Sequence, residues 1–317
     1  MRSSSALLVL ALAVSFVGSL AGCAAEEEED AAESSAEVKG KKKLQRFDVL
    51  THNIGGGAEN DPGDKGIAYT FSQIDARNPD VVMLEEVCHS QYESFKARYP
   101  TWNVLFAQMR ASHPGCANGE AKGQVLASRR AMVEELREDL GDVDPSGDKH
   151  FTLLCGAVPM PKTARKVLAC VTHLRAQGSD PAAAEAARGR QAQRIHALLK
   201  DRIRGGQAVV VAGDFNAGPH RDTLDPLYRL TRGGNFGGGL FDEADQTDAR
   251  REKFADEGVR CRAGACRSGE GTMANNGAKL DFVFFSHNRV KGDLGADPLD
   301  NGGSGHRMYK AWAELDL

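Results

Sequence analysis

An acid and an amide follow a short apolar segment in the second half of the chain. Residues 209–212 are all small or apolar, and Asp214 and Asn216 come soon after them, shortly before a proline. Such a run predicts a buried strand that ends in a turn. Because strand side chains alternate between faces, Asp214 and Asn216 point to the same side if the strand continues through them. An isolated pair of this kind is usually a turn that bonds to its own backbone, so a catalytic interpretation depends on the other candidate residues.

Those candidates lie at or near the ends of other apolar segments. Asn53 closes one segment, Glu86 lies late in the next, His173 ends a third and Asp281 lies within a fourth. An ionisable side chain among apolar neighbours must find a partner or become neutral. Each residue could serve the structure alone, but a sheet that ended these strands together would collect oxygen ligands and histidines in one pocket. The pattern therefore predicts a polar site at the edge of a sheet.

The segments that would position these residues form a strand-rich α/β pattern. The longest predicted helix has Asp180 as its N-cap and ends at Gly205. Large apolar and aromatic residues also recur at helical spacing from Ile67 and again from Tyr92, which predicts two further helices. The long helix should bury Ile195, Leu198, Leu199 and Ile203 and expose Arg188, Arg190 and Arg194. Apolar runs predict strands at 46–54, 81–87, 102–108, 123–129, 151–158, 166–174, 208–213, 279–286 and 308–317.

The composition is that of an ordinary globular protein, with 317 residues, 41% of them hydrophobic. A chain of this length can bury one large core or two modest ones. Acidic and basic residues are nearly balanced, with a formal net charge of −4. The charge as a whole therefore predicts no attraction to polyanions.

The first residues have the pattern of an export signal. Arg2 precedes an apolar run at 6–17, which is too short to span a bilayer as a stable helix. Leu-Ala-Gly-Cys at 20–23 resembles a bacterial lipobox, which predicts a signal peptide over 1–22 and a lipidated Cys23. The charged stretch 23–43 should be a flexible tether before a domain at 44–317. We expect an exported protein, either a membrane-anchored lipoprotein or, as the alternative, a secreted one.

The cysteines after Cys23 are even in number, which favours disulfides in an exported chain. Cys155 and Cys170 lie on two apolar runs joined by a loop with two prolines, and a symmetric hairpin would place them directly opposite each other. Cys261 and Cys266 would close a small loop, which leaves Cys88 with Cys116. The rival is a zinc site, but the chain has no Cys-x-x-Cys pair.

An ordered set of short motifs resembles the endonuclease/exonuclease/phosphatase superfamily. This superfamily includes DNase I-like nucleases, exonuclease III-like repair enzymes, neutral sphingomyelinases and inositol polyphosphate 5-phosphatases. The resemblance covers residues 44–317 and implies a DNase I-like four-layer α/β sandwich, in which two mixed β-sheets pack face to face with helices outside. The motifs are Thr51-His52-Asn53, Leu84-Glu85-Glu86-Val87, the segment 123–129, Thr172-His173-Leu174, Gly213-Asp214-Phe215-Asn216, Leu280-Asp281-Phe282 and Ser304-Gly305-His306.

The resemblance implies a role for each matching residue. Asn53 and Glu86 match the residues that hold a catalytic divalent metal, usually Mg²⁺, with Mn²⁺ or Ca²⁺ as alternatives. Carboxylate and amide oxygens suit such a hard cation. Asp214 and Asn216 match the pair that orients the attacking water and contacts the phosphate.

Two histidines complete the implied site. His306 resembles a general base or phosphate ligand that Asp281 orients, and a carboxylate so placed favours the charged imidazolium. His173 resembles a histidine that steadies the scissile phosphate or protonates the leaving oxygen. Glu120 is a candidate for the acid that orients His173.

The motifs also depart from the family pattern. Gly305 stands where the family usually has aspartate, and Asp297, Asp300 or a water could substitute for the missing carboxylate. Glu85 stands where many relatives carry glutamine and should add charge beside the metal. His52 alternates to the opposite face from Asn53, which predicts a structural role.

We therefore expect an exported, metal-dependent phosphodiesterase, acting as a monomer on DNA or RNA. A phospholipid or phosphosugar phosphoesterase is the alternative, and a non-catalytic surface binding protein is the second. The basic segment 248–267 suits a nucleic-acid backbone or is simply a solvated loop. A lipid substrate is disfavoured because the sequence shows no exposed aromatic hairpin that would seat the protein on a bilayer.

Overall fold

The computed structural model describes residues 43–57, 64–142, 147, 149–229, 238–246, 267 and 269–317. The predicted signal peptide and nearly all of the predicted tether lie outside these residues, as do Cys261, Cys266 and most of the basic segment 248–267. Within the described part of the chain, no helix is both long and apolar enough to cross a membrane.

One six-stranded sheet combines the early and the final strands of the chain. Its strands are β1 (Gln45–Asn53), β2 (Val81–Cys88), β3 (Asn103–Arg110), β4 (Lys122–Ser128), β11 (Val290–Pro298) and β12 (Tyr309–Leu315). They lie in the order β11-β12-β1-β2-β4-β3. β1 and β2 are parallel, and the other neighbours are antiparallel, so the sheet is mixed as predicted.

The second six-stranded sheet comes from the middle of the chain. Its strands are β5 (Glu135–Asp139), β6 (Thr152–Pro159), β7 (Lys166–His173), β8 (Ala208–Asp214), β9 (Phe241–Glu243) and β10 (Asp281–Ser286). They lie in the order β5-β6-β7-β8-β10-β9. Only β7 and β8 are parallel neighbours among these strands.

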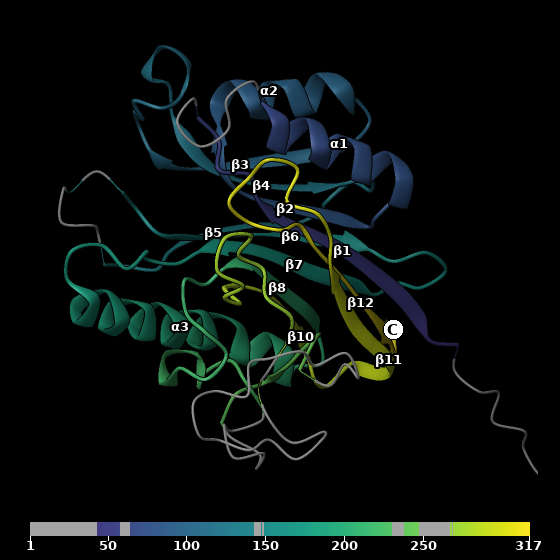
Figure 1. Ribbon diagram of the computed structural model, residues 1–317. Helices are drawn as coiled ribbons and strands as arrows, with labels where there is room; N and C mark the ends of the chain where they lie inside the picture. The colour runs from purple at the N-terminus through teal and green to yellow at the C-terminus, as the bar shows by residue number, and fades with distance from the viewer. Residues whose placement is uncertain are drawn as a thin grey trace, which may run out of the picture. The chain divides into compact units, whose positions relative to one another are not determined.

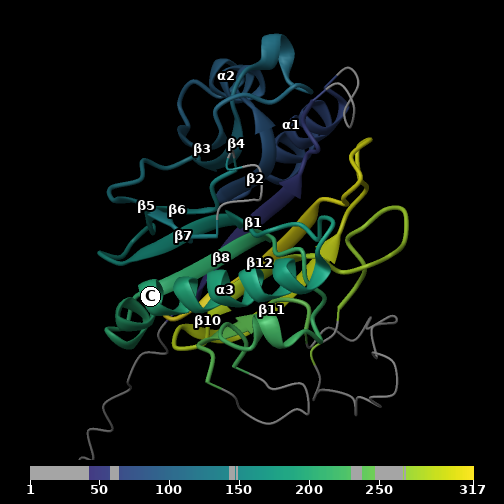
Figure 2. The same ribbon diagram turned by 90° about the vertical axis from the view of Figure 1, so that its left-hand side faces the viewer.

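The two sheets pack face to face, with helices on their outer faces (Figures 1 and 2). Val49 of β1 and Met83 of β2 share one core cluster with Leu154 of β6 and Val210 of β8. The outer face of the first sheet packs against α1 (Lys65–Arg77) and α2 (His89–Arg98), and that of the second against α3 (Pro181–Arg204). Because both faces of each sheet are covered, the sequences of the central strands are nearly continuous runs of apolar residues.

The long helix begins and ends where the sequence predicts. The Asp180 carboxylate accepts a hydrogen bond from the Ala183 backbone N–H at 3.0 Å, and Gly205 follows the last turn. Arg188 was predicted to be solvated and is buried instead, donating to the Arg175 carbonyl at 3.0 Å. Position 188 is four residues from both Ala184 and Ala192, so it shares their buried face.

Three strands were not predicted, and each has a weak apolar pattern. β5 lies at a sheet edge and exposes alternate residues, β9 is only 3 residues long, and β11 contains two glycines and ends in proline. Edge strands need less apolar surface than central ones, because part of their surface stays in water. Their pairing partners, rather than their own sequences, therefore define them.

Two disulfides join the described cysteines. Cys155 and Cys170 are directly opposed in the β6–β7 pair, with Cα atoms 4.0 Å apart, which confirms the predicted register. Cys88 at the end of β2 is bonded to Cys116, with Cα atoms 5.6 Å apart. The second bridge fastens the loop before β4 to the end of the strand that carries Glu86.

Candidate active site

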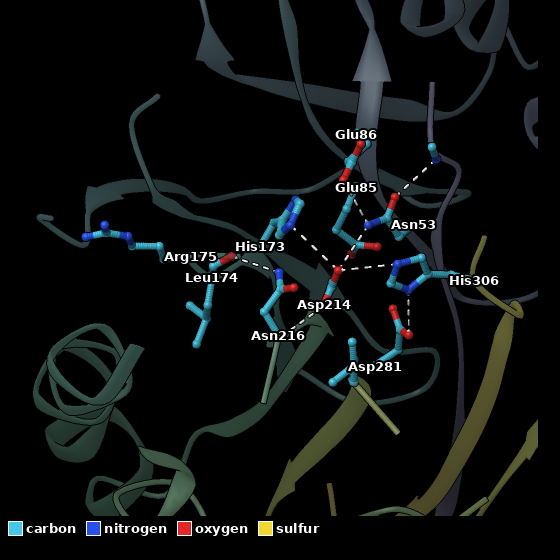
Figure 3. A network of polar contacts seen from close by, with 12 residues as sticks. Asn53, Glu85, Glu86, His173, Leu174, Arg175, Asp214, Asn216, Asp281 and His306 are labelled. Atoms are coloured by element: carbon cyan, nitrogen blue, oxygen red, sulfur yellow. Dashed lines mark hydrogen bonds and ion pairs between the residues drawn. The ribbon is translucent and has the colours of Figure 1, made fainter. Parts of the chain in front are cut away.

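The predicted site residues meet at one edge of the sandwich (Figure 3). In the second sheet, β7 and β8 are parallel and end side by side, which pairs His173 with Asp214. β10 runs antiparallel to β8, so its first residue, Asp281, is also in register with Asp214. Asn53 ends β1 in the facing sheet, and its amide reaches across to Asp214.

Asp214 is the centre of the cluster. Its Oδ2 accepts a hydrogen bond from Asn53 Nδ2 at 3.0 Å and lies 3.6 Å from His173 Nε2 and 3.7 Å from His306 Nε2. Burial and the nearby Asp281 raise the pKa of Asp214, while the two histidines counteract that rise. The Asn53 amide on Oδ2 and the Asn216 backbone N–H on Oδ1 hold this carboxylate in place, with the two histidine rings beside Oδ2.

Asn216 reaches the cluster by a turn and not by strand alternation. β8 ends at Asp214, and Asn216 has a left-handed backbone with φ of 50°. Its backbone N–H donates to Asp214 Oδ1 at 2.8 Å, while its side-chain amide donates to the Leu174 carbonyl at 3.0 Å. The turn interpretation is confirmed, and it is compatible with a functional role because the turn fixes the carboxylate of Asp214.

His306 and Asp281 form the predicted pair. His306 Nδ1 donates to Asp281 Oδ2 at 2.9 Å, which leaves Nε2 facing Asp214. Burial would lower the pKa of His306, but the charges of Asp281 and Asp214 outweigh it and raise that pKa to about 10. In the absence of a cation, His306 is thus an imidazolium at neutral pH.

The loop that carries His306 is anchored to β1. The Ser304 hydroxyl donates to the Asn53 carbonyl at 2.6 Å and accepts from the His306 backbone N–H at 3.1 Å. His52 Nε2 donates to the His306 carbonyl at 3.2 Å, and its Nδ1 lies 3.0 Å from the Thr70 hydroxyl. Burial lowers the pKa of His52 to about 4, so it is a neutral support, in agreement with the predicted structural role.

Gly305 is exposed, and a Cβ added there would meet no atom within 4 Å. The acids that face the His306 ring are Asp281 and Asp214. Asp300, one predicted substitute for the missing aspartate, accepts instead from the backbone N–H of Asn301 at 2.7 Å. Asp297, the other, lies on β11 in register with Lys310.

Glu86 enters the site because β2 contains a β-bulge. Glu85 and Glu86 together oppose a single residue of β4, and Glu86 has a left-handed backbone with φ of 58°. Strict alternation would place Glu86 on the same face as Leu84, which packs under the helices. The bulge turns its carboxylate to Asn53 Nδ2 at 3.3 Å and Lys122 Nζ at 2.7 Å. Burial opposes ionisation, but His173 and Lys122 hold the pKa of Glu86 well below its usual range.

Glu85 does not add charge beside the site, contrary to the sequence-based expectation. It lies on the inner face of β2, fully buried, and accepts from the Thr51 hydroxyl at 3.1 Å. Burial and then the charges of Asp281 and Asp214 raise its pKa well above the ordinary value, which disfavours its ionised form. Gly213 leaves room for it, since a Cβ there would lie 2.9 Å from Glu85 Oε1 and 1.9 Å from the Thr172 carbonyl.

His173 is buried beside Asp214, and the prediction that Glu120 orients it is wrong. Glu120 accepts instead from the Ser90 hydroxyl at 2.5 Å, and the acid that faces His173 is Asp214. Burial, reinforced by Lys149, lowers the pKa of His173 to about 4. His173 is therefore a neutral imidazole next to a positively charged His306.

The donor set fits a divalent cation. The Asp281 Oδ1 atom is buried without a hydrogen-bond partner, and Asp214, Asp281 and His306 are close enough together to share an ion. The mutual repulsion of these acids is a cost that a cation would relieve. Asn53 Nδ2 donates to Glu86 and to Asp214, and Asn53 Oδ1 accepts from the Gly55 N–H. The Asn53 oxygen could therefore join such a metal site only after the side-chain amide turned.

Sequence reasoning missed a group of cations beside Glu86. A pocket of about 200 Å³ is lined by Glu86 and His173 on the side of the cluster, and by Arg110, His113, Lys122 and Lys149 elsewhere. Lys122 directly precedes one of the family motifs, which was a usable signal, whereas Lys149 lies between strands with no pattern around it.

Known proteins share this fold. The sequence model of the Endonuclease/Exonuclease/phosphatase family matches residues 50–302. Comparison with curated proteins gave no match.

Among solved structures, the human Nocturnin catalytic domain with bound sulfate anion is 17% identical, with a TM-score of 0.62 over 86% of this chain and 97% of that one. An endonuclease/exonuclease/phosphatase family protein from Bacteroides thetaiotaomicron is 14% identical, with a TM-score of 0.63 over 87% and 100%. A mannosyl-6-phosphatase from the same species is 16% identical, with a TM-score of 0.61 over 85% and 99%. These likenesses confirm the predicted four-layer sandwich.

Proposed function

Because the chain belongs to the Endonuclease/Exonuclease/phosphatase family, we propose that it is a divalent-metal-dependent phosphodiesterase that acts on nucleic acid. Members of that family hydrolyse phosphoesters, so the reaction class follows from membership, and the non-catalytic alternative is set aside. The observation that carries the proposal is the arrangement around Asp214 Oδ2, which Asn53, His173 and His306 all face.

His306 acts on the phosphate as a cation in this proposal. Asp281 holds Nδ1, which leaves Nε2 as a donor toward the site. An imidazolium in a partly buried site binds the negative charge that develops on a phosphoryl oxygen, and it can give its Nε2 proton to a leaving oxygen. Of the two roles predicted for His306, the raised pKa favours the phosphate ligand over the general base.

Asp214 binds the attacking water. His306 and His173 offset the effect of burial on its ionisation, and Asn53 and the Asn216 backbone hold its two oxygens. A fixed carboxylate can accept a hydrogen bond from a water and take its proton as the water attacks. The neutral His173 ring packs against the same carboxylate and limits where that water can lie.

Glu86 would hold the cation together with Asn53, once the Asn53 amide has turned its oxygen from the Gly55 N–H toward the ion. Mg²⁺ is the ion we propose because these donors are hard oxygens. When bound, such an ion polarises a phosphoryl oxygen and offsets its charge. Manganese has the same preference for oxygen and should substitute.

The described surface supports a nucleic-acid substrate over a membrane lipid. Among the described residues, Val133 is the one large hydrophobic residue that is exposed, with an exposed fraction of 55%. A bilayer-bound enzyme needs a group of apolar or aromatic side chains on its surface. The cations around the pocket beside Glu86 are instead suited to phosphate.

A phosphosugar phosphoesterase is the second candidate. The volume of that pocket, about 200 Å³, suits a compact anionic ligand and equally suits one unit of a polymer. The experiment that separates these activities is incubation of the purified protein with plasmid DNA, RNA, mannose 6-phosphate, sphingomyelin and bis-p-nitrophenyl phosphate, with and without Mg²⁺. Nucleic-acid cleavage that requires the metal supports the proposal, and release of phosphate from the sugar alone would replace it with the second candidate.

Metal dependence has its own test. EDTA should abolish hydrolysis, and Mg²⁺ or Mn²⁺ should restore it. Glu86→Ala should weaken metal binding by calorimetry, since it removes a charged ligand, whereas Asp214→Ala should lose turnover even at saturating metal. Full activity after chelation would contradict the assignment.

We also propose that residues 1–22 direct export and that Cys23 is lipidated. The two disulfides support an oxidising compartment, because such bonds persist outside the cytoplasm. Cys23→Ser should move the protein from the membrane fraction to the soluble fraction. Equal membrane association of both forms would exclude lipidation as the anchor.

A further inference from the structure

The pocket beside Glu86 has a charge pattern that hydrolysis of a single phosphate does not require. Glu86 and His173 form the wall that it shares with the site, while Arg110, Lys122 and Lys149 line the rest. Glu86 is the acid of the lining, and its Oε2 already accepts from Lys122 at 2.7 Å. The pocket is therefore richer in positive than in negative charge.

Burial makes this arrangement costly. The Lys122 side chain is only 9% exposed. Burial lowers the pKa of Lys149, with repulsion from Arg110 and Lys122 acting in the same direction and the attraction of Glu86 and Asp214 acting against it. Cations held close together with little water repel one another unless an anion lies between them. A cluster of perturbed charges in a cleft is a candidate functional site.

We propose that this pocket binds a second phosphate group of the substrate, next to the one that is hydrolysed. The inference rests on the proposed function, because it treats Glu86 and His173 as the border between the reacting phosphate and its neighbour. It also restricts the substrate class to compounds that carry two phosphates close together.

The chemistry of the lining fits phosphate. Lysine provides a compact charge with three donors, and arginine provides a planar pair of donors that matches phosphate oxygens. The volume of about 200 Å³ is smaller than pockets for drug-sized ligands, which suits a small anion. The second phosphate is either a terminal phosphomonoester or the next phosphodiester of a polymer.

The test compares substrates that differ only in the second phosphate. We would measure kcat/KM of the full protein on dTpdT, on its 5′-phosphorylated and 3′-phosphorylated forms, and on dTpdTpdT. The wild type should prefer at least one of the longer or phosphorylated compounds by about tenfold or more. Preference for a phosphorylated dimer identifies a terminal monoester, whereas preference for the trimer alone identifies a backbone phosphate.

Lys149→Met and Arg110→Met are the test variants, and the exposed Lys291→Met on β11 is the matched control. Each test variant should reduce the preference for the favoured compound by about tenfold, since one charged contact is lost. Lys291→Met should keep it. Equal turnover of dTpdT and the other compounds by the wild type, or an unchanged preference in both test variants, would overturn the inference.

Binding without catalysis separates this inference from the proposed function. In EDTA, pyrophosphate should bind the wild type, and its affinity by calorimetry should fall about tenfold in Lys149→Met but not in Lys291→Met. If that fall is seen and no phosphodiester is hydrolysed, the proposed function fails and the anion pocket stands. If phosphodiesters are hydrolysed but pyrophosphate affinity is the same in all three proteins, the pocket inference fails alone.

Discussion

Two of the groups of buried charges among the described residues differ in their access to water. Lys279 lies 3.3 Å from Glu243 Oε1 and 3.3 Å from Asp245 Oδ2, donates to the Tyr309 hydroxyl at 2.6 Å, and is 0% exposed. In the active-site group, by contrast, the side chain of His306 is 14% exposed and that of Glu86 is 28% exposed.

The comparison shows that a shifted pKa does not by itself identify a site. Burial, partly offset by Lys279, raises the pKa of Glu243 to about 8, a shift in the same direction as that of His306. Structural ion pairs perturb pKa values as catalytic groups do. What distinguishes the active-site group is its position at strand ends beside a pocket, whereas protein groups surround Lys279. We therefore expect mutations in the first group to change activity and those in the second to change stability.

The largest expected effect is on turnover. His306→Ala should lower kcat/KM by about 10² to 10⁴, because general acid and electrostatic contributions have that size. With Mg²⁺ bound, the melting temperature should change little, because the cation then offsets the charges of Asp214 and Asp281 in place of His306. Steady-state kinetics and thermal melts of both proteins in Mg²⁺ check this, and a large drop in melting temperature under that condition would place His306 with the structural group.

Lys279→Met should lower the free energy of unfolding rather than the turnover. It leaves Glu243 and Asp245 buried without their cation, and breaking a buried pair by removing one partner costs about 3 to 5 kcal/mol. Urea denaturation measures the loss. Lys291→Met, on an exposed lysine, should change stability by less than about 0.5 kcal/mol. Similar stability of the two variants would remove the distinction between the groups.

The pH dependence of stability sharpens the comparison. His306 has a pKa raised to about 10 in the folded protein, against about 6.5 when unfolded. Its contribution is complete below pH 6.5 and is lost as the pH rises toward 10. In EDTA, the urea midpoint of the wild type should fall over this window more steeply than that of His306→Gln. Parallel curves would show that the raised pKa does not contribute.

The smallest expected effect concerns Gly305. A Cβ there meets no atom within 4 Å, so Gly305→Asp should fold normally and place a carboxylate next to His306. We expect kcat/KM or metal affinity to rise by about tenfold or less, equivalent to about 1.4 kcal/mol. Gly305→Asn, which has the same size without the charge, is the control. Loss of activity in the aspartate variant alone would show that the site already has all the negative charge it tolerates.

The sequence predicts the position of most site residues because they follow apolar strands. Asn53, His173 and Asp214 each end a strand, and parallel pairing brings such ends to one edge. The family motifs then add His306, which has no strand pattern of its own. Chain order and strand character together with the family motifs were thus enough to predict the candidate site.

Several features of the candidate site could not be predicted from the sequence, because they depend on how distant segments of the chain pair and pack. The position of Glu86 needs a bulge, which exists only because two residues of β2 oppose one of β4. The raised pKa of Glu85 needs burial between two sheets. Lys149 joins the pocket from an irregular segment, where periodicity carries no information.

The pairing of β1 with β12 also has a consequence for synthesis of the protein. Seven residues of β1 pair with β12, from Gln45 with Leu315 to Thr51 with Tyr309, and Asn53 lies just beyond this ladder. A ribosome makes β12 long after β1 has emerged, so one edge of β1 has no partner until then. Contacts between segments so distant form late. The surroundings of Asn53 are therefore complete only after β12 has been made, and a chain released before that point lacks the pairing that holds this part of the candidate site.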